Sequence, residues 1–336
     1  MTTHVNFNFL NSRRCLIVLL PVFLLFSGCS DPEPFMGKQF RADDNGTWAL
    51  LESESISAIY GVGLSYVKHI EETGSTWDPD AIPPIFKKSI SSLNTSEILP
   101  YPDRTQFLQA AENLETGLSN LLKIKFPQIN PLLDYEVELG IVLLEPYERK
   151  RSQDITYMPR LGFVLAGDFT SRSFMVLGEG QADMFSYWGA AKSFNGFSVV
   201  GSKMWIPGDF QQNGSLHVQL ETYVNGKLRQ SGNTSDQVYS PYQMVRFVAE
   251  AFPDDPLAAG TVIMSGTPPG VAFQAPGWKR TLAKILGINR MTLMKSVMES
   301  NKDNEDFLKP GDIVIYSAGP LGQLSFTVQN ASLILR

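Results

Sequence analysis

Cysteine is almost absent from this chain of 336 residues, which contains only Cys15 and Cys29. No Cys-x-x-Cys pair and no cluster of cysteine with histidine occurs, so the sequence argues against a structural zinc site. Both cysteines lie before residue 30, so the rest of the chain cannot form internal disulfides.

An excess of positive charge is also missing. The chain has 28 Lys and Arg against 34 Asp and Glu, a formal net charge of -6, so we do not expect nucleic acid as a partner. With 43% hydrophobic and 18% charged residues, the composition is that of an ordinary globular protein. The length suits one large domain or two small ones.

The N-terminal segment has the pattern of an export signal. Two arginines at positions 13 and 14 precede an apolar run, residues 16–26, that is too short to span a bilayer comfortably. The sequence Leu-Phe-Ser-Gly-Cys at residues 25–29 then resembles a bacterial lipoprotein signal, cleaved before and lipidated on Cys29. An uncleaved membrane anchor is the alternative.

This pattern predicts a signal peptide at residues 1–28, then a lipidated Cys29 and a polar tether at 29–47, and a folded domain at 48–336. Lipid on Cys29 would hold the mature protein on a membrane of the bacterial cell envelope, outside the cytoplasm. Ser30 stands where an aspartate would signal retention in the inner membrane, which favours the outer membrane.

From residue 48 onward, short β-rich runs alternate with turns. Asn225-Gly226 is a strong hairpin turn signal. We therefore expect a β-rich α+β domain rather than regular βαβ units. The expected strands are 57–64, 133–144, 162–169, 216–224, 260–264 and 312–316, and the expected helices are 65–72, 106–124 and 240–251.

Two carboxylates, Glu136 and Glu138, stand two residues apart inside an apolar run. On a strand, side chains at i and i+2 point the same way, so both would share one face. Burying two like charges is costly unless something compensates. A divalent cation such as Mg²⁺, Mn²⁺ or Ca²⁺ would do so, because hard cations prefer oxygen ligands. A solvated strand face is the alternative.

Five segments, read together, resemble the fumarylacetoacetate hydrolase family. They occur in the family's order between Ile59 and Val328, nearly the whole mature domain. The resemblance implies a mixed β-sandwich roll with a metal at its centre, usually as a homodimer. The segments are residues 61–72 (GVGLSYVKHIEE), 165–172 (LAGDFTSR), 191–197 (AKSFNGF), 264–271 (MSGTPPGV) and 308–312 (LKPGD).

The resemblance also implies roles for individual residues. It places a metal, Mg²⁺ or alternatively Mn²⁺ or Ca²⁺, on Glu136, Glu138 and Asp168. It makes His69 a general base oriented by Glu72, three residues later, for activating water. Lys192 would be the cation beside the metal.

Substrate-binding roles follow from the same resemblance for Arg172, Thr267 and Lys88. Arg172 would face a substrate carboxylate or brace the site, and Thr267 would offer donors to a substrate oxygen. The chain departs from the family pattern where asparagine is usual: it has Ser65, Gly167 and Phe326 there. Residues 275–307 form a longer connection than is typical, with a basic, amphipathic helix at 281–300 interrupted at Gly287.

The resemblance implies a metal-dependent hydrolase that cleaves a C–C bond in an acylpyruvate-like or β-diketone substrate. A 2-oxo-acid decarboxylase of the oxaloacetate type, or an enol–keto isomerase, would use the same metal site. An alternative of another class is a non-catalytic binding lipoprotein. For residues 275–307 we expect a cap over the active site or a dimer contact, with a surface resting on anionic lipid as the alternative.

Overall fold

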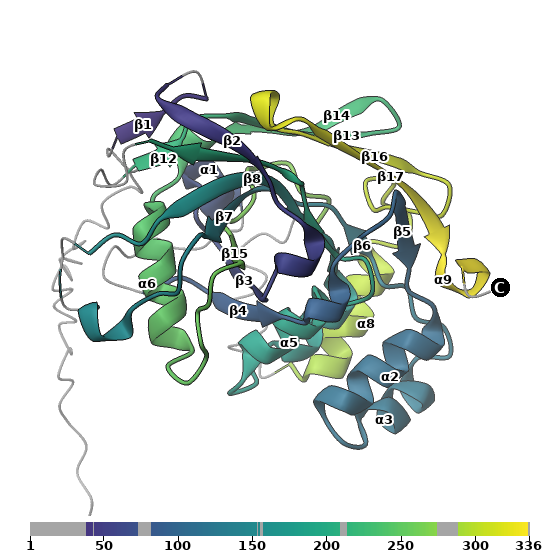
Figure 1. Ribbon diagram of the computed structural model, residues 1–336. Helices are drawn as coiled ribbons and strands as arrows, with labels where there is room; N and C mark the ends of the chain where they lie inside the picture. The colour runs from purple at the N-terminus through teal and green to yellow at the C-terminus, as the bar shows by residue number, and fades with distance from the viewer. Residues whose placement is uncertain are drawn as a thin grey trace, which may run out of the picture.

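The computed structural model describes residues 38–42, 44–72, 82–152, 154, 157–208, 214–273 and 288–334. These residues form a strand-rich α+β fold with two large mixed sheets. Figure 1 shows the smaller of these sheets along the top of the molecule, above the larger one. Helices α2, α3, α5 and α8 gather at the lower right. The predicted fold class is therefore confirmed.

The larger sheet carries the strand that contains Glu138. Its central strands β7 and β8 pair antiparallel, and every residue of both is buried. Burial on both faces explains why these strands read as nearly continuous apolar runs. In order, the sheet contains β2 (Gly46–Leu50), β11 (Lys203–Pro207), β8 (Leu161–Asp168), β7 (Val137–Leu143), β15 (Thr261–Met264), β3 (Ala58–Val62) and β4 (Ile85–Lys88), with β10 (Ser198–Val200) beside β8.

The five-stranded sheet packs over one end of these central strands. Its hairpin turns at Asn225 and Gly226, which both have positive φ (50° and 77°), as the sequence predicted. In order, its strands are β14 (Lys227–Asn233), β13 (Gln219–Val224), β16 (Ile313–Ser317), β17 (Gln323–Asn330) and β5 (Ile98–Tyr101). Two short pairs complete the described strands: β1 (Lys38–Phe40) with β12 (Gly214–Leu216), and β6 (Leu133–Asp134) with β9 (Thr170–Ser171).

Three of the described α-helices begin directly after residues whose side chains cap them, Asp103, Ser240 and Asn289. Ser240 forms a capping box with Gln243 at the start of α6, so the helix predicted at 240–251 is confirmed. The single helix predicted at 106–124 is wrong, because the chain turns at Gly117, whose φ of 86° favours glycine. The described α-helices are α1 (Val67–Glu72), α2 (Arg104–Leu114), α3 (Leu118–Lys125), α4 (Arg172–Met175), α5 (Met184–Ala191), α6 (Pro241–Ala251), α8 (Arg290–Ser300) and α9 (Ala331–Ile334).

The folded part of the chain begins earlier than residue 48. Strand β1 pairs in parallel with β12, and Phe40 is buried against Trp205. Strand β2 starts at Gly46 and pairs with β11. The stretch at 38–47 was predicted as tether because its polar composition does not reveal these long-range strand pairings. Cys29 and the export signal lie outside the described residues. No helix among the described residues is long and apolar enough to cross a membrane.

Part of the unusual 275–307 connection is described. Residues 274–287 lie outside the described residues, and with them residues 281–287 of the helix predicted at 281–300. Helix α8 packs on α4 and on the short helix η4 (Val176–Gly178), with Met294 fully buried. Arg290 at its start forms a bidentate ion pair with Glu115, with N–O distances of 2.6 and 2.7 Å. Helix α8 therefore packs directly against α4, the helix that begins with Arg172.

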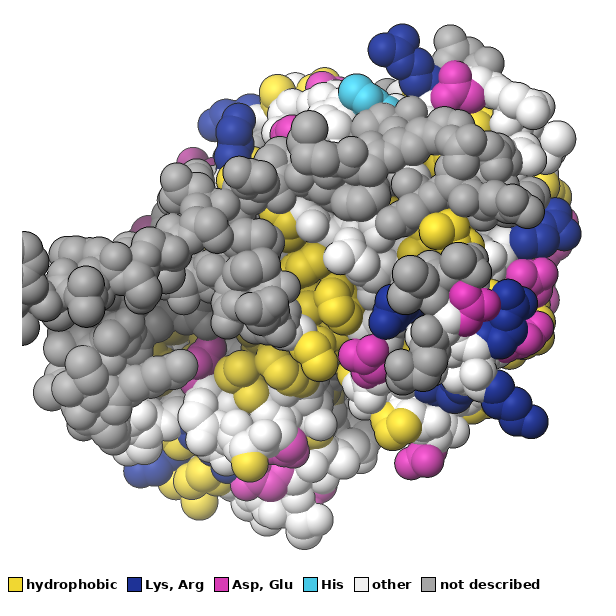
Figure 2. Space-filling view, turned by 90° about the vertical axis from the view of Figure 1, so that its left-hand side faces the viewer, with side chains coloured by type: hydrophobic (Ala, Val, Ile, Leu, Met, Phe, Trp, Pro, Cys, Tyr) yellow, Lys and Arg dark blue, Asp and Glu magenta, His cyan; other side chains and the backbone are white. Residues whose placement is uncertain are grey.

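The surface is mixed in character. Figure 2 shows hydrophobic side chains gathered near the middle of one face, with Lys, Arg, Asp and Glu mostly around its border. Other exposed large hydrophobic side chains include Leu50 on β2, Ile313 on β16 and Ile124 on α3. Single exposed apolar residues are normal for a globular protein and carry no functional meaning here.

Candidate metal centre

Three carboxylates meet where β7 and β8 run side by side. Glu136 lies in the break between β6 and β7, Glu138 is the second residue of β7, and Asp168 is the last residue of β8. The backbone N–H of Asp168 donates to the carbonyl of Glu136 at 2.8 Å, which holds the strand ends together. One oxygen of each carboxylate lies within 4.8 Å of the others, and all three side chains are buried.

Two lysines reach this cluster from other elements. Lys192 caps the end of α5, and its Nζ lies 2.7 Å from Asp168 Oδ2 and also pairs with Glu136. Its Nζ donates to Thr170 Oγ1 at 2.8 Å as well. Lys88, the last residue of β4, donates from Nζ to Asp168 Oδ1. Because both ammonium groups are buried, their charges act on the carboxylates with little screening.

Arg172 opens α4 and braces the cluster from the other side. Its Nε donates to Asp134 Oδ2 at 2.7 Å and its Nη2 to Glu136 Oε1. Its third nitrogen, Nη1, lies 3.8 Å from the sulfur of Met175. Two nitrogens of the guanidinium are therefore bound to the protein's own carboxylates, those of Asp134 and Glu136.

Asp134 is a part of the site that the sequence reasoning missed. Its carboxylate accepts from the backbone N–H groups of Ala272 and Phe273, at 2.9 and 3.1 Å, as well as from Arg172. It is fully buried. Asp134, Glu136 and Glu138 follow one another at every second position, so the same periodicity argument could have extended to it.

The charges of the cluster do not balance among the described residues. Four carboxylates face three cationic side chains, and the ion pairs of these cations fall on Asp134, Glu136 and Asp168. Glu138 instead accepts a hydrogen bond from the backbone N–H of Gly266, at 2.7 Å. With every group ionised, one negative charge would be left uncompensated near Glu138.

The pKa values of the two glutamates diverge for this reason. Burial alone would raise the pKa of Glu136, but the charges of Arg172 and Lys192 outweigh it and lower this pKa to about 2. Burial, followed by repulsion from Asp168 and Glu136, raises the pKa of Glu138 well above its ordinary value. A divalent cation among the three oxygens would supply the missing positive charge. The residues therefore fit such an ion.

The Gly-Thr-Pro-Pro turn after β15 closes one side of the cluster. Gly266 has φ of 87°, and a Cβ there would come within 2.3 Å of Ser65 Oγ, so the turn requires glycine. The hydroxyl of Thr267 donates to the carbonyl of Val137 at 3.0 Å and accepts from Gln230 at 2.7 Å. The hydroxyl of Thr267 is therefore bound to the strand that carries Glu138. Its role as a donor to a substrate oxygen, which the resemblance implied, stays a prediction.

His69 lies on the short helix α1 and is buried. If protonated, its imidazolium would also lower the pKa of Glu136, after Arg172 and Lys192, so His69 lies near the cluster. Glu72 is the last residue of α1, but its side chain lies outside the described part of the chain. The predicted contact between His69 and Glu72 stays a prediction.

Two of the departures from the family pattern, Gly167 and Phe326, belong to one aromatic cluster. The ring of Tyr316 occupies the space beside Gly167, where a Cβ would come within 2.2 Å of it. Phe169 stacks on Tyr316 at 5.3 Å between ring centroids, and Phe326 packs edge-on against both rings. An aromatic cluster therefore stands behind the carboxylates where the family usually has asparagines.

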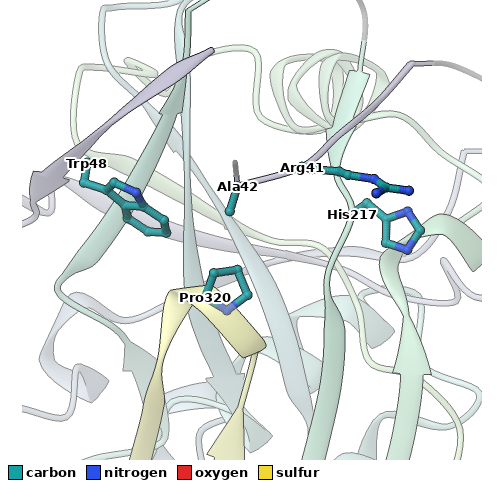
Figure 3. Close-up of a pocket in the computed structure, with 5 residues that line it drawn as sticks. All are labelled: Arg41, Ala42, Trp48, His217 and Pro320. Atoms are coloured by element: carbon teal, nitrogen blue, oxygen red, sulfur yellow. The ribbon is translucent and has the colours of Figure 1, made fainter. Parts of the chain in front are cut away.

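A pocket elsewhere has no part in this cluster. Arg41, Ala42, Trp48, His217 and Pro320 line a shallow cavity of about 430 Å³ near β1 and β2 (Figure 3). His217 is exposed and stands between β12 and β13, and Figure 3 shows it beside Arg41. None of these residues contributes to the carboxylate cluster.

The fold and this cluster together define a β-rich protein with a buried carboxylate centre for a divalent cation. Residues 58–329 match the sequence model of the family described as "Fumarylacetoacetate (FAA) hydrolase C-terminal". The chain belongs to this family. The membership suggested by the five sequence segments is thereby confirmed.

Individual relatives are more distant. The chain is 28% identical to a 2,4-didehydro-3-deoxy-L-rhamnonate hydrolase of Sphingomonas sp. (strain SKA58), over 65% of this chain and 63% of that protein. It is 28% identical to an oxaloacetate tautomerase of Bacillus subtilis (strain 168), over 67% of this chain and 63% of that protein. The matched stretch thus spans less than two thirds of either relative's length.

The fold is shared with solved structures. One is a probable 2-hydroxyhepta-2,4-diene-1,7-dioate isomerase from Mycobacterium abscessus, with a TM-score of 0.52 and 23% sequence identity. That likeness covers 83% of this chain and 77% of the other. At this identity it shows the fold alone.

Proposed function

We propose that this protein is a divalent-metal-dependent hydrolase that cleaves a C–C bond in an acylpyruvate-like or β-diketone acid. The observation that carries the proposal is the buried cluster of Glu136, Glu138 and Asp168 with the ammonium group of Lys192 bound to two of them. We propose Mg²⁺ as the ion, with Mn²⁺ or Ca²⁺ as alternatives, because all three accept carboxylate ligands.

A cation held by three carboxylates would leave coordination positions for two substrate oxygens and would stabilise the negative charge that develops when the bond breaks. Lys192 supplies a second, fixed positive charge: Asp168 and Glu136 outweigh its burial and raise its pKa. Arg172 keeps Glu136 charged by binding its Oε1, while Asp134 holds Arg172 in place.

His69 would accept the proton of an attacking water on one of its ring nitrogens. The effect that a protonated His69 would have on the pKa of Glu136 supports a place beside the cluster. In this proposal Glu72 orients the imidazole, and Lys88, Thr267 and Arg172 shape the substrate side of the site.

A second candidate is enol–keto isomerisation or decarboxylation of a 2-oxo acid such as oxaloacetate. Two relatives carry the name oxaloacetate tautomerase, one from Bacillus subtilis and one from rice, each 28% identical to this chain. The same metal and lysine would stabilise the same enolate-like charge. Hydrolysis differs because it additionally requires a base that activates water.

One panel of assays tests these proposals. The purified full-length protein, loaded with Mg²⁺, is incubated with a series of 2,4-diketo acids and with oxaloacetate. Loss of the diketo absorbance with release of two acids supports the hydrolase. Turnover of oxaloacetate alone supports the second candidate. Metal binding without turnover of any substrate would contradict both and leave the binding lipoprotein. Glu138→Gln serves as the inactive control.

We further propose that Cys29 is lipidated and that the protein is held on the outer membrane, outside the cytoplasm. The N-terminal sequence pattern supports this location. We also propose a homodimer, and light scattering of the detergent-solubilised protein would measure it.

A further inference from the structure

The chain that carries Glu136 and Glu138 is irregular at its most important point. Strand β6 ends at Asp134 and β7 begins at Val137, so two residues between them are outside any strand. The backbone N–H groups of Glu136 and Val137 are bound by side chains instead. Glu136 N donates to the hydroxyl of Tyr316 at 3.2 Å, and Val137 N donates to Gln230 Oε1 at 3.1 Å. Both side chains come from the five-stranded sheet.

Gln230 reaches beyond this strand. Its Nε2 donates to Thr267 Oγ1 at 2.7 Å and to the carbonyl of Pro268 at 2.9 Å. Its Oε1 also accepts from Thr222 Oγ1 at 2.8 Å. With 1% of its surface exposed, the amide therefore uses both of its donors and both acceptor positions inside the protein. Its orientation is fully determined.

The amide of Gln230 joins the strand at Val137 to the turn at Thr267 and Pro268, and these two segments hold the metal ligand Glu138. Glu138 stands on the strand side, and its Oε2 accepts from the N–H of Gly266 on the turn side, at 2.7 Å. The described ion pairs of the cluster hold Glu136 and Asp168 but not Glu138. The direction of the Glu138 carboxylate therefore depends on the position of the turn relative to the strand. Gln230 fixes this position because it is hydrogen-bonded to both.

We infer that Gln230 and Tyr316 are positioning residues: the five-stranded sheet uses them to hold Glu136 and Glu138 in the geometry that binds a divalent cation. The inference rests on the proposed metal centre. Tyr316 binds the backbone N–H of Glu136, and Gln230 binds the backbone N–H of Val137 and the hydroxyl of Thr267, so each acts through the backbone or the turn. Partners of this kind typically change metal affinity by about 10–100-fold when they are removed.

The test measures Mn²⁺ binding by calorimetry on the metal-free, full-length protein. Gln230→Met keeps the length of the side chain but removes all four hydrogen bonds, and should raise the dissociation constant for Mn²⁺ by about 10–100-fold. Tyr316→Phe removes one hydroxyl and should raise it less. Gln219→Met and Tyr223→Phe are matched controls on neighbouring β13, where Gln219 is exposed and Tyr223 half-buried, and should leave it unchanged.

Each outcome decides something. A parent protein that binds no Mn²⁺ overturns the metal centre and this inference with it. A parent that binds, together with a folded Gln230→Met variant of equal affinity, overturns the inference alone, even if the variant is less stable to urea. If Gln230→Met does not fold, Tyr316→Phe and Thr222→Val each remove a single hydroxyl from the same network. Parent-like Mn²⁺ affinity in both would equally contradict the inference.

Discussion

Removing the charge of Glu136 should change how the stability of the metal-free protein depends on pH. The unfolded chain binds a proton at Glu136 with an ordinary pKa of 4.5, whereas in the folded protein burial is outweighed by Arg172 and Lys192 and the pKa is about 2. Between these two pH values the unfolded state holds more protons. Stability from this residue is therefore fully present above about pH 4.5 and is lost as the pH falls towards 2.

The size of the effect follows from the two pKa values. A tenfold difference in proton affinity corresponds to about 1.4 kcal/mol, so a pKa lowered from 4.5 to about 2 contributes about 3 kcal/mol to the free energy of unfolding. Glu136→Gln also leaves Arg172 and Lys192 without a partner, which destabilises at every pH. Only the part of the difference that varies with pH reports on the charge of Glu136.

Urea titrations across this pH window, without metal, measure the difference between parent and Glu136→Gln. The parent should lose about 3 kcal/mol more than the variant as the pH falls through the window. Glu299→Gln, an exposed position on α8, controls for the removal of any glutamate. Parallel loss of stability in parent and Glu136→Gln would refute the argument that the two cations hold this carboxylate charged.

Four further predictions concern metal, base, anchor and insertion. Glu138→Gln should abolish tight Mn²⁺ binding. In the parent, the raised pKa of Glu138 means that Mn²⁺ binding releases a proton, so the affinity for Mn²⁺ should rise with pH. A Mn²⁺ affinity that does not change with pH in calorimetry would contradict this. His69→Ala should lower kcat of hydrolysis by roughly 10²–10⁴ with Mn²⁺ affinity nearly intact, and full turnover would exclude it as the base. Cys29→Ser should abolish incorporation of labelled lipid, which mass spectrometry of the parent should detect on Cys29; an unmodified parent would overturn the anchor. Arg290→Met should lower the free energy of unfolding by roughly 0.5–1 kcal/mol without changing Mn²⁺ affinity, because its partner Glu115 is partly exposed; a lost metal site would show that α8 holds the centre directly.

Much of the site could be predicted because its signals are local. Glu136 and Glu138 can be recognised because they stand two residues apart within an apolar run. The hairpin at Asn225-Gly226 can be recognised because both residues accept positive φ. The helix predicted at 240–251 begins with a capping box at Ser240, which is also a local feature. Each of these features depends only on residues that are close together in the sequence. Over such short distances the residue types alone constrain the backbone conformation.

Other features became visible only in three dimensions. Strand β1 needs β12, more than 170 residues away, and nothing in the polar sequence before residue 48 indicates that pairing. Gln230 and Tyr316 look like ordinary strand residues, since any glutamine or tyrosine there satisfies the alternation of buried and exposed positions. Their meaning comes from contacts across two sheets, with Val137 and Glu136 as partners.

The sequence by itself indicated Glu136, Glu138 and the turn residues, because these depend on residue type and short spacing, and it indicated Asp168 through the resemblance to the family. The tertiary structure alone decided how their charges are compensated. Arg172, Lys192 and Lys88 come from separate elements, and only their convergence makes one glutamate strongly acidic and leaves the other without a cationic partner among the described residues. Electrostatic energies depend on distance and burial, and long-range packing sets both.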